Sequence, residues 1–154
     1  MRIVDTSAWA WGDLQPHWPA IVHALKRRAE RFPNDESLEM RVRHIIGGVD
    51  RLWLIFDEEV PIMALLVSIV TCEASGHRRL VIDGVGATPG ADGVGFKRKI
   101  DECMPLVAEV EAWGAEQGIT EVEIRGRRGW KRLFEPYGYG EAAVVLRKKI
   151  GGSP

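Results

Sequence analysis

The spacing of apolar residues predicts a strand and two helices at the start of the chain. A short strand is expected over residues 1–6. In residues 13–32, apolar side chains recur every three or four positions and basic side chains occupy the other side, as in an amphipathic helix. Ser37 is a suitable N-cap and the Gly47-Gly48 pair a suitable stop, so a second helix is expected between them.

The middle of the chain predicts three consecutive strands. Residues 51–73 are too long and too β-branched near their end for one helix, and they indicate two strands joined at residues 57–59. Residues 77–89 add a third apolar strand after a glycine turn. A polar, glycine-rich loop is expected over residues 90–102.

Helices and strands alternate in the second half. Residues 104–118 have helical spacing, and a strand (119–126), a short helix (129–138) and a last strand (141–150) are expected to follow. The order β-α-α-β-β-β-α-β-α-β predicts one mixed α/β domain over residues 1–150, with a tail at 151–154. Adjacent strands in the middle should be antiparallel, and the later crossovers should add parallel neighbours.

Composition and charge exclude several classes of protein. The chain has 21 Lys and Arg against 22 Asp and Glu, which argues against a nucleic-acid binder driven by bulk charge. The sequence shows neither a signal-peptide pattern nor an uncharged apolar run long enough for a membrane helix, so a cytoplasmic protein is expected. Cys72 and Cys103 are expected to be reduced, buried thiols. The histidines lack metal-ligand spacing, so no metal site is predicted.

Two strings in this order carry a family resemblance: "LVIDGVGA" at residues 80–87 and "VEAWGAEQGITEVEIRGRRGWKRLFEPYGY" at 110–139. With the order of elements, they resemble the Gcn5-related N-acetyltransferase (GNAT) superfamily, and in particular a small divergent variety encountered in bacteriophage genomes. The resemblance implies a single GNAT-like domain with a central mixed β-sheet flanked by helices. It also implies acetyl transfer from acetyl-CoA to an amine on a small molecule or a protein.

The resemblance also implies where the cofactor would bind. In the family, pantetheine pairs with backbone exposed where two strands separate, and the pyrophosphate lies at the start of the main helix. The alternatives are a flexible surface loop at residues 90–95 and a solvated turn at "RGRRGW". The implied contacts are Ile82, Gly84, Val85 and Gly86 for pantetheine, and Gly93, Gly95, Arg127 and Arg128 for the phosphates.

Three residues are candidates for proton transfer. The family pattern Tyr-x-x-x-Gly-(Phe/Tyr) places Phe134 at the usual tyrosine, so Tyr137 is the candidate donor if the chain bends at Pro136, while Tyr139 is expected to pack as the core aromatic. Asp83 either faces the amine site or caps a turn at a sheet edge. Glu73 is a second candidate base, with His77 nearby as a surface alternative.

Two functions therefore remain open from the sequence. The first is an acyl-CoA-dependent N-acetyltransferase, favoured by the strand "LVIDGVGA" and the turn "GRRGW". The second is a catalytically degenerate GNAT-fold phage protein that binds a host or virion protein partner. The missing tyrosine at Phe134 favours this second function.

Overall fold

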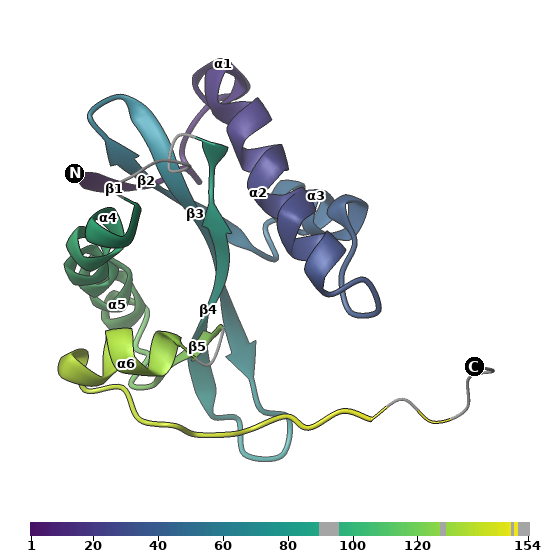
Figure 1. Ribbon diagram of the computed structural model, residues 1–154. Helices are drawn as coiled ribbons and strands as arrows, with labels where there is room; N and C mark the ends of the chain where they lie inside the picture. The colour runs from purple at the N-terminus through teal and green to yellow at the C-terminus, as the bar shows by residue number, and fades with distance from the viewer. Residues whose placement is uncertain (90–95, 127–128, 149, 151–154) are drawn as a thin grey trace.

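The centre of the molecule is a five-stranded sheet in the order β1-β2-β3-β4-β5, seen in a computed structural model that describes residues 1–89, 96–126, 129–148 and 150 (Figure 1). Strands β1 to β4 are antiparallel neighbours, and β5 is parallel to β4. This confirms the predicted mixed sheet. The strands are β1 (Arg2–Asp5), β2 (Arg51–Asp57), β3 (Val60–Thr71), β4 (Arg78–Ala87) and β5 (Val122–Arg125).

Helices cover both faces of the sheet (Figure 1). One face carries α1 (Trp11–Leu14), the 3-10 turn η1 (Gln15–His17), α2 (Trp18–Arg31) and α3 (Leu38–Ile46). The other face carries α4 (Phe96–Cys103), η3 (Met104–Leu106), α5 (Val107–Glu116), α6 (Trp130–Phe134) and η4 (Glu135–Tyr137).

Local signals in the sequence set several of these boundaries. Ser37 Oγ accepts a hydrogen bond from the Met40 amide at 3.1 Å and so caps α3 as predicted. Gly48, with φ at 73°, follows the end of α3, and a left-handed residue is easiest for glycine there. The β2–β3 turn lies at the predicted residues, with Glu58 at φ 54°.

Strand alternation divides the hydrophobic core into two layers. Successive residues of β2 illustrate this, because Leu54 packs with α2 while Ile55 packs with the α5 face, and both are fully buried. In β4, Ile82 belongs to the α5 layer. Residue 83 of β4 therefore faces α2 and α3.

The prediction of a loop over residues 90–102 is wrong for the part that the structure describes, because α4 begins at Phe96. Two apolar residues explain the helix. Ile100 and Cys103 are one turn apart, and both contact the α5-side core. The apolar pattern here is too short to identify from sequence, since the surrounding positions are charged.

The prediction of a last strand at residues 141–150 is also wrong for the described residues. Residues 141–148 form neither helix nor strand, and their side chains are exposed. A strand needs hydrogen bonds from a neighbouring strand, and an apolar run in the sequence does not supply that neighbour.

The expectation for the cysteines holds in part. Neither thiol forms a disulfide among the described residues, but Cys72 is exposed, whereas Cys103 is buried as predicted. Cys72 lies just after β3, in the turn of the β3–β4 hairpin, and such turns lie on the surface. None of the described helices is long and apolar enough to cross a membrane.

Candidate functional site

The pairing between β4 and β5 ends before β4 does. The last paired residues are Asp83 and Arg125, whereas β4 continues to Ala87. On β3, Leu65 pairs with Gly84 and the adjacent Ala64 pairs with Gly86, so Val85 has no partner and forms a bulge. Residues 84–87 therefore lie on backbone that pairs with β3 on one side and extends past the end of β5 on the other. Peptide groups on such an edge can bind an amide-containing chain.

Among the described residues, glycine at position 86 leaves space beside this edge. Gly86 has φ at 114°, a conformation that side-chain-bearing residues rarely adopt, and a Cβ built on it would meet no atom within 4 Å. The space beside Gly86 is thus open. Ile82, by contrast, is fully buried in the core, so a role in cofactor binding would fall to its backbone.

Asp83 is held by two arginines on the α2–α3 face. Its Oδ1 accepts a hydrogen bond from Arg28 Nη2 of α2, and its Oδ2 accepts one from Arg41 Nη2 of α3, both at 3.1 Å. These contacts replace the two expected environments, an amine-facing carboxylate and a turn cap.

The same arginines bind further carboxylates. Glu36 contacts both, at 2.8 Å from Arg28 Nη2 and 2.9 Å from Arg41 Nη2, and Asp50 lies 3.2 Å from Arg41 Nη1. The side chains of these five residues are at most 14% exposed. We call Arg28, Glu36, Arg41, Asp50 and Asp83 the ion network.

Buried charges in the ion network shift two pKa values. Burial alone would raise the pKa of Glu36, but hydrogen bonds from Arg41 and Arg28 hold it below its ordinary value. Burial would lower the pKa of Arg41, and the hydrogen bond and charge of Glu36 instead raise it. Both groups are therefore charged at neutral pH.

The sequence contained one signal for this network. Arg41 lies on the same helical stripe as Leu38, Val42 and Ile45, where an apolar residue is expected. A charged residue on a core-facing stripe indicates a buried partner. Of the three carboxylates that Arg41 contacts, Glu36 and Asp50 are near it in sequence, whereas Asp83 is 42 residues away.

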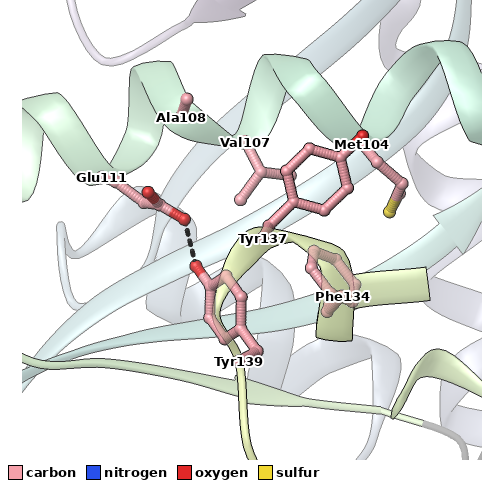
Figure 2. Close-up of a pocket in the computed structure, with 7 residues that line it drawn as sticks. All are labelled: Met104, Val107, Ala108, Glu111, Phe134, Tyr137 and Tyr139. Carbon is pink, nitrogen blue, oxygen red and sulfur yellow. Dashed lines mark hydrogen bonds between the residues drawn. The ribbon is translucent and has the colours of Figure 1, made fainter. Parts of the chain in front are cut away.

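The opposite face holds a small hollow of about 100 Å³ between α5 and the chain after α6 (Figure 2). Figure 2 shows Tyr137 and Tyr139 pointing from that chain toward α5. Phe134, at the family's usual tyrosine position, is buried beside them. The hollow is lined by Met104, Val107, Ala108, Glu111, Phe134, Tyr137 and Tyr139.

Tyr139 is the core aromatic that the sequence predicts. Its ring packs edge-on against Phe134 at a centroid distance of 5.3 Å, and its hydroxyl donates to Glu111 Oε1. Burial and the neighbouring Glu111 carboxylate raise the pKa of Tyr139. Tyr137 differs, since its side chain is half exposed and lines the hollow.

The candidate proton-transfer residues do not converge. Asp83 faces α2 and α3, whereas Tyr137 contributes to a hollow against α5 on the other side of the sheet. Glu73 is exposed in the β3–β4 turn. The register places the end of that hairpin five residue pairs from Asp83, roughly 17 Å along the strand. His77, in the same turn, lies 2.9 Å from Glu121.

The four predicted phosphate contacts lie outside the described residues: Gly93, Gly95, Arg127 and Arg128. The structure does fix the elements around them. α4 starts at Phe96, and β5 ends at Arg125, whose Nε donates to Glu123 at 2.6 Å. A Cβ on Gly126, the residue after β5, would lie 2.3 Å from the Trp130 ring of α6, so glycine is required for that close packing.

Solved structures resemble the chain over nearly its whole length. One described as a probable acetyltransferase superposes with a TM-score of 0.64 at 10% identity, over 100% of this chain and 99% of the other. A predicted acetyltransferase with acetyl-CoA from Clostridium acetobutylicum has a TM-score of 0.52 at 12% identity, over 96% and 94%. A transcriptional regulator from Bacillus halodurans C-125 has 0.61 at 19% identity, over 96% and 98%.

Sequence comparisons add no family assignment. No protein-family model matches the chain, and no curated protein matches it by sequence. The structural likeness, at these low identities, establishes the fold alone. The chain has the α/β fold of the GNAT acetyltransferase structures, as its sequence predicts.

Proposed function

We propose that the protein is an acyl-CoA-dependent acyltransferase that modifies an amine. The observation that carries this proposal is the separation of β4 from β5, where pairing ends at Asp83 while β4 continues through the Val85 bulge to Ala87. An uncovered strand edge between two parallel strands suits the amide groups of a pantetheine arm. The likeness to acetyltransferase structures supports the same function.

The residues present fit acetyl-CoA. Gly84 and Gly86 leave a strand edge without bulky side chains, and the space beside Gly86 is open. The amino terminus of α4, at Phe96, follows the glycine-rich segment directly, so its free amides and helix dipole favour the pyrophosphate. Bound acetyl-CoA would supply the activated acetyl thioester.

Two sets of side chains would act on this site. Tyr137 Oη would hold the proton that the leaving sulfur needs, because Phe134 has no hydroxyl. Asp83 has a positioning role in this proposal. Its two arginine contacts anchor β4 to α2 and α3 two residues before the Val85 bulge, which fixes the direction of the exposed backbone.

Acetyl-CoA binding is the first test. At about 100 times its dissociation constant, a ligand stabilises the folded state by about 2.7 kcal/mol, which raises the melting temperature measurably. Coenzyme A should give a similar shift, and dephospho-CoA a smaller one if the phosphates are bound. No shift at millimolar acetyl-CoA would contradict the proposal.

Gly84→Val tests the location of the cofactor. A branched side chain on the exposed edge should abolish the acetyl-CoA shift while the variant stays folded by circular dichroism. Gly12→Val is the matched control, because a Cβ on Gly12 meets no atom within 4 Å. If acetyl-CoA raised the melting temperature of both variants equally, the cofactor would not bind at β4.

Tyr137→Phe tests catalysis separately from binding. Loss of a general acid should reduce turnover by about 10²–10⁴-fold, with the acetyl-CoA shift unchanged. Turnover is measured as thiol release with a panel of primary amines. Wild-type turnover in this variant would remove Tyr137 from the mechanism.

The second function, a catalytically degenerate protein that binds a protein partner, is favoured by one observation. Phe134 is only 6% exposed and cannot donate a proton from the family's usual position. This alternative predicts that acetyl-CoA leaves the melting temperature unchanged and that no amine is acetylated.

A further inference from the structure

An apolar segment near the carboxyl end of the described chain is exposed to solvent. We call residues 141–148 the C-terminal segment. Its side chains at Val144, Val145 and Leu146 are 66%, 74% and 89% exposed. Three consecutive large apolar residues at this exposure are unfavourable in water, so a surface that covers them would be stabilising.

Weak contacts hold the C-terminal segment to the rest of the described chain. Lys131 pairs with Glu141 at 3.4 Å, and Arg147 pairs with Asp35 in the loop before α3. All four side chains are substantially exposed, and ion pairs of this kind contribute little stability. In Figure 1 the segment (yellow) runs from the α6 side across the view below the sheet, toward the side that carries α2 and α3, and does not join the sheet.

Among the described residues, the outer edge of β5, the last strand in the sheet, has no strand beside it. The Leu80 amide donates to Glu121 O at 3.0 Å, so the backbone groups of Glu121 point toward β4. Because these directions alternate, the amide and carbonyl groups of Val122 and Ile124 point away from β4, toward the open edge.

The side-chain pattern of the C-terminal segment fits this edge. Ala142, Val144 and Leu146 would share one face of an added strand, with Ala143, Val145 and Arg147 on the other. Val122 and Ile124 pack against the α5-side core. The uniformly apolar face would therefore extend that core, and the opposite face would place Arg147 on the side of Glu123, which pairs with Arg79.

We infer that the C-terminal segment of one copy adds as a strand to the β5 edge of a second copy, and that the exchange is reciprocal. Each copy presents both the strand and the edge, which is what a closed two-fold interface requires. Within one copy, Tyr139 fixes the start of the segment against α5, and Arg147 draws its end toward the loop at Asp35. Both elements thus stay available to a partner.

The mass in solution tests this inference. Sedimentation equilibrium should give twice the mass of one chain at micromolar concentration. The double variant Val144→Asp/Leu146→Asp should give the mass of one chain with its far-ultraviolet circular dichroism unchanged, since neither side chain is buried in a single copy. Val145→Thr is the control on the opposite face of the added strand, the face that carries Arg147, and this variant should stay dimeric.

Hydrogen exchange distinguishes the partner. Amides of residues 142–146 and of Val122 and Ile124 should be protected in a concentration-dependent manner. A single-chain mass with protection independent of concentration would show that the segment folds back on its own β5 edge, and would overturn the inference. A dimer that survives Val144→Asp/Leu146→Asp would show a different interface, with the same consequence.

A shortened chain provides a second route. A chain that ends at Gly140 keeps the β5 edge and lacks the strand, so it should be monomeric and should bind a fluorescent peptide of residues 141–150. The same peptide with Val144→Asp and Leu146→Asp should bind at least tenfold more weakly. Equal binding of the two peptides, or binding of neither, would contradict strand addition at this edge.

Discussion

The two faces of the sheet stabilise β4 by different means. On the α2–α3 side, Asp83 is bound by Arg28 and Arg41 within a buried cluster of five charged side chains. On the α5 side, the neighbouring Ile82 lies in an apolar layer in which shape complementarity dominates. Asp83 is therefore held in place by charge, and its neighbour Ile82 by apolar packing.

This difference determines how each face should respond to mutation. Buried ions are stabilised only by their partners, so removing one partner leaves the others desolvated and unpaired. Apolar packing responds instead to volume and overlap. The ion network should therefore be sensitive to the loss of single charges and to acid, and the α5 face to changes in size.

The largest effect is expected from Arg41→Met. Its guanidinium contacts Glu36, Asp50 and Asp83, and leaving these carboxylates short of a cation should lower the free energy of unfolding by about 3–5 kcal/mol. Urea denaturation measures the change. Arg43→Met is the control on the same helix, because Arg43 is 76% exposed and pairs only with Glu39 among the described residues. Similar losses in both variants would contradict a special role for the ion network.

A smaller effect is expected from Gly126→Ala on the opposite face. The added methyl group would lie 2.3 Å from the Trp130 ring, and relieving that overlap should lower the free energy of unfolding by about 1–3 kcal/mol. Gly129→Ala is the matched control, since a Cβ there meets no atom within 4 Å. Thermal unfolding of the two variants should separate them clearly. Equal melting temperatures would mean that α6 shifts freely.

Tyr139→Phe should have a still smaller effect. The substitution keeps the ring packed on Phe134 and removes the hydroxyl that donates to Glu111, a loss of about 0.5–1.5 kcal/mol. Tyr137→Phe should leave the free energy of unfolding unchanged, because that side chain is half exposed. A larger loss at Tyr137 than at Tyr139 would reverse the assignment of the core aromatic.

Acid should weaken the ion network through Glu36. The pKa of Glu36 is lowered in the folded state, so its contribution is fully present above its ordinary value of 4.5 and is lost as pH falls through the folded-state value. The free energy of unfolding should therefore decrease below about pH 4.5. The slope should be shallower in Arg41→Met, and an unchanged slope would mean that other carboxylates govern the acid response.

Local patterns in the sequence determined much of the fold. The period of the apolar residues located β1 to β5, α2, α3 and α5, and Ser37 and the β2–β3 turn lie where their chemistry predicts. These features depend on residues within a few positions of each other. The strings "LVIDGVGA" and "GRRGW" also indicated the GNAT-like fold that the structural likeness establishes.

The tertiary structure decided the features that depend on distant residues. Asp83 meets Arg28 and Arg41 only after α2 and α3 pack on β4, so no local pattern could assign its partners. The separation of β4 from β5 depends on where a register ends. Residues 142–146 form an apolar run suited to a strand yet lie outside the sheet, because a strand forms only where another strand offers its edge, and the local sequence carries no information about that edge.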